Sequence, residues 1–114
     1  MAYYAPGMGR AFHPRAVNFS RGWVHTSTWN LISMPILQFT QEIRNAVLMV
    51  HGENAHSRYF SEDAYKNMTS GSGEKWAANK ELVVVPGAVH TDLYDKYEFI
   101  PFGRIEEFFG ENLK

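Results

Sequence analysis

The sequence has no cysteine, no strong excess of either charge and no long apolar run. Without cysteine there is neither a disulfide framework nor a thiolate nucleophile or metal ligand. The formal net charge is -1 and no block of like charge occurs, so nothing indicates binding to nucleic acid or anionic lipid. No run approaches the ~20 apolar residues of a membrane-spanning helix, and the first residues lack the apolar core of a signal peptide. We therefore expect a cytoplasmic protein, because a reducing compartment suits a chain without disulfides.

What the sequence does contain is typical of one folded domain of modest size. Its 114 residues are 45% hydrophobic, which is a globular rather than a disordered composition. Residues 1–33 combine glycines and prolines with many aromatic side chains, so we expect an irregular arm that packs on its own domain or on a partner. The aromatic residues of this arm are Tyr3, Tyr4, Phe12, Phe19, Trp23 and Trp29. Residues 34–114 are predicted to form a βαβα unit.

Two continuous apolar runs predict two β-strands. The predicted strands that contain these runs cover residues 46–51 and 81–85. Neither run alternates with polar residues, which is typical of parallel strands buried on both faces. The sequence therefore predicts an α/β fold with a parallel sheet. Because two strands alone rarely form a stable sheet, we expect oligomerisation or a further polypeptide to complete it.

Three helices are predicted around these strands, over residues 35–43, 61–68 and 103–113. Pro35 is tolerated in a first helical turn after a capping Ser33, and the last helix has an amphipathic pattern. The middle helix is expected to begin with Ser61 as its N-cap, with Phe60 and Tyr65 forming a hydrophobic staple. The alternation of strands and helices favours βαβ connectivity.

Ionisable side chains follow both predicted strands. Glu53 and His56 lie in the loop after the first strand, and His90 and Asp92 lie in the loop after the second. The carboxyl ends of neighbouring parallel strands meet at one edge of a sheet, where open α/β folds bind their ligands. The sequence therefore predicts a site at this edge, with Asp92 expected to hold its own loop.

Three segments resemble the last third of an α/β-hydrolase. They are LMVHGENAHSRYFSEDAY, KELVVVPGAVHTDLYDK and IPFGRIEEFFGENL, and they look like the bacterial dienelactone-hydrolase-like and peptidase-like serine hydrolases. The resemblance extends over residues 3–114 and implies a partial α/β-hydrolase fold in which His90 is the triad histidine. It also implies a triad acid in the loop after Gly52. That loop has no aspartate: the aligned position falls on His56, and Glu53 is the nearest carboxylate.

The nucleophile elbow of that family, a G-x-S-x-G turn after a mid-sheet strand, is missing from the sequence. Gly71, Ser72 and Gly73 do not match it, because they lie between the two predicted strands. The resemblance therefore implies a C-terminal fragment of a serine hydrolase that acts on an ester or amide. We expect this fragment to be inactive alone and to use neither a cofactor nor a metal. The sequence does not indicate its small-molecule substrate.

Other functions stay open. The chain can be a non-catalytic module that forms a homo-oligomer or binds a separate N-terminal hydrolase half. It can also be a complete small esterase that uses Ser57, next to His56, as nucleophile. A zinc site made of His51, His56 and His90 is disfavoured, because no short H-x-x-x-H spacing occurs.

Overall fold

The computed structural model describes residues 25–113, which belong to two compact units divided after Pro35. In the first unit the described residues form helix α1 (His25–Ser33), with Trp29 and Ile32 exposed. The prediction of an irregular arm is therefore wrong for this part, and residues 1–24 lie outside the described range. The helix ends where it does because the residue before Pro35 disfavours the helical conformation.

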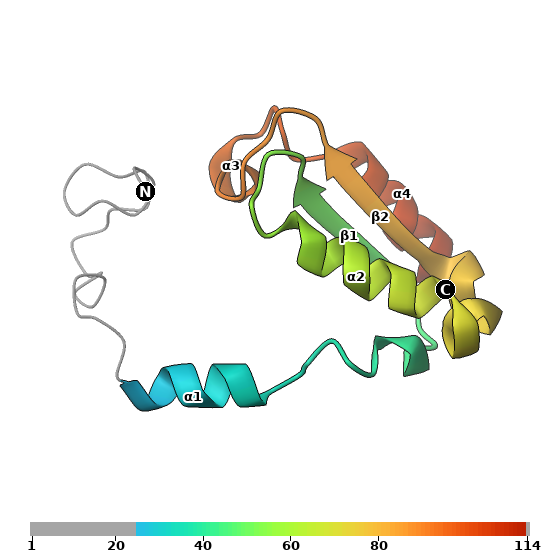
Figure 1. The fold of residues 1–114 in the computed structure, drawn as a ribbon. Coiled ribbons are helices and arrows are strands. Elements are labelled where there is room, and N and C mark those ends of the chain that lie inside the picture. Colours follow the sequence, from blue (N-terminus) through green and yellow to red (C-terminus); the bar gives the residue numbers. More distant parts are fainter. Residues whose placement is uncertain (1–24, 114) are drawn as a thin grey trace. The chain divides into compact units, whose positions relative to one another are not determined.

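The second unit is built on a two-stranded parallel sheet (Figure 1). Strand β1 (Val47–Gly52) pairs with β2 (Lys80–Val85), in a register that aligns Val47 with Lys80 and Gly52 with Val85. Both predicted strands are confirmed to within a residue at each end. The mixed α/β class is confirmed with them.

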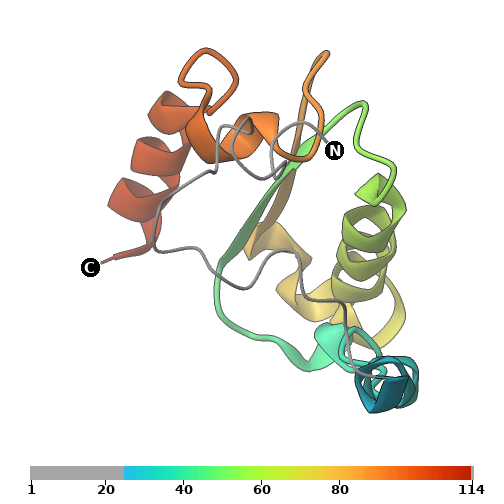
Figure 2. The same cartoon turned by 90° about the vertical axis from the view of Figure 1, so that its left-hand side faces the viewer.

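Helices cover both faces of this sheet. Helix α2 (Arg58–Thr69) lies against one face, and α4 (Phe102–Asn112) lies on the other, as Figures 1 and 2 show from two directions. The short α3 (Asp92–Asp95) lies near the carboxyl end of β1. None of the helices in residues 25–113 is long and apolar enough to cross a membrane.

The predicted start of the middle helix is wrong. Helix α2 begins at Arg58, with Ser57 in the N-cap position, so that Ser61 and the proposed staple residues already lie inside the helix. Arg58 forms an ion pair with Glu62, four residues later, at 3.0 Å. This ion pair stabilises the extra turn at the start of the helix. Because Ser61 is not the N-cap, its hydroxyl is available for another contact.

The predicted helix over residues 35–43 is also wrong, apart from the single 3-10 turn η2 (Thr40–Glu42). Thr40 donates its hydroxyl hydrogen to the carbonyl of Leu37 at 3.1 Å, which offers the backbone a local alternative to helix. Ile36 and Phe39 are exposed, so no packed apolar face stabilises a longer helix. A further 3-10 segment, η3 (Gly71–Asn79), connects α2 to β2.

The hydrophobic core of the second unit is small. Its buried apolar residues are Ala55, Ala64, Met68, Val85, Ala88 and Phe108. The four apolar residues at the start of β1 are only half-buried, although the sequence predicts full burial on both faces. The described elements therefore cover the sheet incompletely.

Candidate functional site

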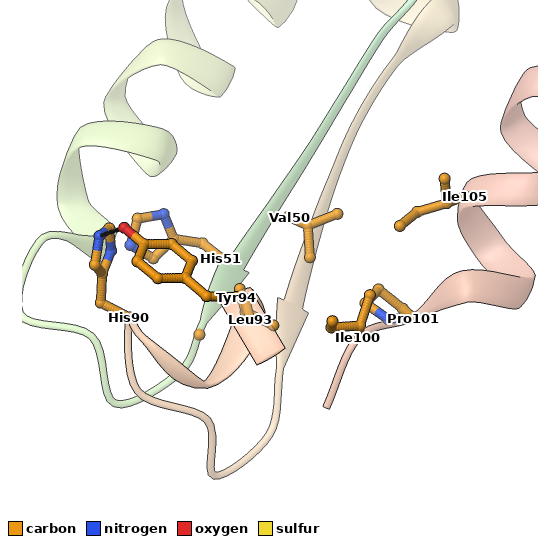
Figure 3. A pocket seen from close by; sticks show the side chains of 9 residues that line it. Val50, His51, His90, Leu93, Tyr94, Ile100, Pro101 and Ile105 are labelled. Carbon is orange, nitrogen blue, oxygen red and sulfur yellow. Dashed lines mark hydrogen bonds between the residues drawn. The ribbon is translucent and has the colours of Figure 1, made fainter. Parts of the chain in front are cut away.

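A pocket of about 260 Å³ lies at the carboxyl end of the sheet on the side of β1 (Figure 3). Its walls are mainly apolar, and its polar groups are two imidazoles and one phenol. The lining residues are Val50, His51, Gly52, His90, Leu93, Tyr94, Ile100, Pro101 and Ile105. An apolar pocket with few polar groups at a strand end is the usual form of a small-molecule site.

His90 reaches this pocket through a tight turn after β2. Gly87 has a φ of 71°, a conformation that glycine adopts without strain. The loop after β1 fastens this turn: Gly87 N donates to Glu53 Oε2 at 2.8 Å, and Asn54 N donates to the carbonyl of Ala88 at 2.9 Å. The two loops therefore hold each other at the carboxyl edge of the sheet.

Asp92 stabilises the loop that follows His90, as the sequence predicted. Its side chain is buried, with 5% of the residue exposed. Oδ2 accepts a hydrogen bond from Val89 N at 3.1 Å, and Oδ1 lies 2.7 Å from Lys96 Nζ. The first contact ties the backbone before His90 to Asp92, and the second pairs the buried carboxylate with a positive charge.

The imidazole of His90 contacts Tyr94, which lies four residues further along. His90 Nε2 and the Tyr94 hydroxyl share a hydrogen bond of 2.6 Å, and the rings meet edge to face (Figure 3). His90 itself is exposed. The ring of His51 lies with its centroid 6.1 Å from that of His90. Two imidazoles and a phenol thus gather at one end of the pocket.

His51 is held differently, by two hydroxyl groups from the start of α2. Its Nδ1 lies 2.9 Å from Ser61 Oγ, and its Nε2 lies 3.3 Å from Ser57 Oγ. Burial lowers the pKa of His51, and the nearby charges of His90 and Arg58 lower it further. The neutral imidazole is therefore favoured, so that one ring nitrogen can accept a proton.

The other predicted site residues lie outside the pocket. Glu53 uses its carboxylate on the backbone of the Gly87 turn, and His56 is exposed. Neither residue lines the pocket that His90 faces. Ser57, which adjoins His56 in the sequence, hydrogen-bonds through its hydroxyl with the ring of His51.

The sequence did not identify this cluster, because His51 was considered only as a disfavoured zinc ligand and Tyr94 was not considered. Position 51 is the last strand residue before Gly52, and strand alternation places its side chain toward α2. That signal could have been used, because the helix start supplies hydroxyl groups. Tyr94 contacts His90 only because residues 92–95 form a helical turn, which no pattern in the sequence predicts.

In residues 25–113 no group of three or more histidine, aspartate or glutamate side chains is placed to hold a metal ion.

No family model matches the sequence. The chain is 49% identical over 105 residues to the uncharacterized protein PA2218 of Pseudomonas aeruginosa, a match that covers 91% of this chain and 26% of that protein. The crystal structure of the hypothetical protein PA2218 from Pseudomonas aeruginosa is similar to it with a TM-score of 0.72 and 48% identity, over 90% of this chain and 30% of that one. The chain thus spans about a quarter of the length of the curated relative it matches, and part of a longer chain adopts the same fold.

Proposed function

We propose that this chain supplies the general base, His90, of a serine-type α/β-hydrolase whose nucleophile lies outside these 114 residues. One observation carries the proposal: His90 stands just beyond the carboxyl end of β2, on a fastened turn, and lines an apolar pocket. A triad histidine needs this combination of a fixed backbone and an accessible ring. The resemblance to bacterial serine hydrolases in the segments around Gly52 and His90 supports the same function.

In the proposed reaction, His90 Nε2 takes the proton of a serine hydroxyl while the serine oxygen forms a bond to the carbonyl carbon of an ester or amide. The proton then passes to the leaving alcohol or amine as its bond to that carbon breaks. A water molecule repeats the two steps and releases the acid. The hydroxyl of Tyr94 now occupies Nε2, so the serine has to displace it.

Glu53 has a positioning role in this proposal. Its carboxylate accepts the hydrogen bond from Gly87 N at 2.8 Å, and this bond fixes the turn that carries His90. Glu53 therefore acts on the backbone that presents the imidazole, and the group that orients the His90 ring itself stays open.

A chimera tests the proposal directly. In it, this chain replaces the 105 matched residues of the Pseudomonas relative, and a fluorophosphonate probe reports a reactive serine without knowledge of the substrate. We expect labelling of a serine outside this chain, slowed by about 10³-fold or more in the His90→Ala variant. The exposed His56 provides the control, since His56→Ala should label at the unaltered rate. Labelling that does not change in His90→Ala would contradict the proposal.

A second candidate function rests on the contact between Ser57 and His51. Ser57 Oγ lies 3.3 Å from His51 Nε2, while Ser61 Oγ contacts the other ring nitrogen. A neutral imidazole in this position can accept the Ser57 proton, which makes Ser57 a candidate nucleophile within the chain. Fluorophosphonate labelling of the chain alone, lost in Ser57→Ala and kept in Ser72→Ala, would support it. Absence of labelling in the unmodified chain would exclude it.

A further inference from the structure

We propose that the open side of β1 is a docking surface for a second polypeptide segment, which adds a parallel strand to the sheet. The surface consists of the main-chain edge of β1 that pairs with no other strand in residues 25–113, and of Val50, Ile100 and Ile105, which line the pocket beside it. Its occupant is the part of a PA2218-like protein that this chain does not match. The inference concerns assembly and does not depend on any chemistry at His90.

The first observation is the open edge itself. Within the described residues the sheet has two strands, and β1 has a strand neighbour on one side only. Figure 2 looks onto the β1 side of the sheet, between α2 and α4, where no further described strand lies. A strand edge presents unpaired N–H and C=O groups, which are a template for another strand.

The second observation is the character of β1. Residues 47–50 are all apolar, yet each is only half-buried. A continuous apolar run is typical of a parallel-sheet strand that is buried on both faces. The pocket of about 260 Å³ continues this surface, since Val50, Ile100 and Ile105 all line it. Soluble proteins seldom leave such a surface uncovered.

The opposite strand differs at its start, where Lys80 and Glu81 are charged, although residues 82–85 are apolar as well. Arg104 on α4 binds Glu81 of β2 through two hydrogen bonds, and it also lies 3.1 Å from Glu107. Lys80, the first residue of β2, is buried and donates to the carbonyl of Asn45 at 2.9 Å. Charged side chains on a strand oppose further pairing. The wholly apolar start of β1 and the pocket beside it therefore favour this side of the sheet for an added strand.

The third observation identifies the occupant. This chain matches 26% of the Pseudomonas relative in sequence and 30% of the related crystal structure, at a TM-score of 0.72. In that protein the same fold segment therefore belongs to a much longer chain. The small core described above, in which half of the buried apolar residues are alanine, also indicates that the segment gains stability by burying β1 against more polypeptide.

Co-expression of this chain with the unmatched part of the Pseudomonas relative, as a separate polypeptide, tests the inference. We expect a one-to-one complex by light scattering and increased protection of the β1 amides from hydrogen exchange. Val50→Arg places a charge on the docking surface and should weaken binding at least about tenfold. Val84→Arg is the matched control on the other strand, where 37% of the valine is exposed, and it should leave binding within a factor of about three.

Three outcomes would overturn the inference. The first is no complex with the unmodified chain, and the second is a homodimer that buries β1 and excludes the partner. The third is β1 amides that are already protected in the chain alone, which would mean that the chain covers this edge itself. The exchange measurement needs no variant, so a failure of Val50→Arg to fold does not affect it. Because neither readout uses a substrate, a complex without hydrolysis would contradict the proposed function and leave the docking surface intact.

Discussion

At the scale of single residues, the two histidines at the carboxyl end of the sheet differ in their surroundings. His51 is half-buried and lies between two serine hydroxyls, whereas His90 is exposed and contacts a phenol. Burial penalises a charged imidazole, so the pKa of His51 is lowered. The two rings therefore have different roles in stability and in chemistry.

His51 makes the stability of the fold depend on pH. Because its pKa is lower in the folded chain than the ordinary value of 6.5, the unfolded chain binds more protons as the pH falls. Its contribution is fully present above pH ~6.5 and is lost as the pH falls through the folded pKa. We expect the urea midpoint to drop from pH 7.5 to pH 5.5 and expect His51→Gln to reduce this drop. If His51→Gln and the control His56→Gln behave alike, the assignment is wrong.

A larger residue at position 52 is expected to clash with the backbone where the two loops meet. A Cβ at this position would lie 2.5 Å from the carbonyl oxygen of Ala88, which is backbone and cannot move aside easily. We expect Gly52→Ala to lower the free energy of unfolding by about 1–3 kcal/mol. Gly103→Ala is the control, because nothing lies within 4 Å of its Cβ position, and it should be neutral or slightly stabilising. Equal urea midpoints for the two variants would contradict the close approach.

Some residues of the candidate site could be predicted from the sequence, and others could not. His90 and Asp92 could be identified because a strand end and a turn precede them in the sequence. The contact of His90 with Tyr94 depends on a four-residue helix, and the contact of His51 with Ser61 joins a strand to a helix ten residues later. Such contacts depend on three-dimensional placement, which local patterns do not specify. For the same reason Glu53 was expected beside His90, whereas its carboxylate holds the backbone of Gly87.

At the scale of elements, the strands were predictable and the helix boundaries were not. The apolar runs of β1 and β2 are enough to predict the strands from the sequence alone. Helix α2 begins one turn before the predicted cap: Ser57 occupies the N-cap position without a capping side-chain hydrogen bond, and the hydroxyls of Ser57 and Ser61 both contact His51. Helix α1 lies in a segment where glycine, proline and aromatic content suggested irregular structure, and its mixed composition gives no clear period.

The attachment of α4 to the sheet gives a prediction at this scale. Arg104 joins α4 to Glu81 of β2 and lowers the pKa of that carboxyl group. We expect Arg104→Gln to increase hydrogen exchange in α4. Glu107 is an exposed ion-pair partner of Arg104, so Glu107→Gln should change the exchange little. The Glu81 contribution is present above pH ~4.5 and is lost as the pH falls through the lowered pKa. Unaltered exchange in Arg104→Gln would show that apolar packing alone holds α4.

At the scale of the whole molecule, the described fold has one two-stranded sheet, a small core and an open apolar side. The match to about a quarter of the Pseudomonas relative gives these features a common explanation. In the account proposed here, a further strand covers β1 and brings a serine to the pocket that His90 lines. The chain then contributes a base and part of the pocket wall, and the rest of the site comes from the added polypeptide.

A crystal structure of the fluorophosphonate-treated chimera tests this account most directly. The account predicts a strand paired with β1 and a modified serine whose Oγ lies about 3 Å from His90 Nε2, with the Tyr94 hydroxyl displaced from that nitrogen. A structure in which β1 has no new neighbour, and in which His90 remains bound to Tyr94 with no serine beside it, would contradict the account.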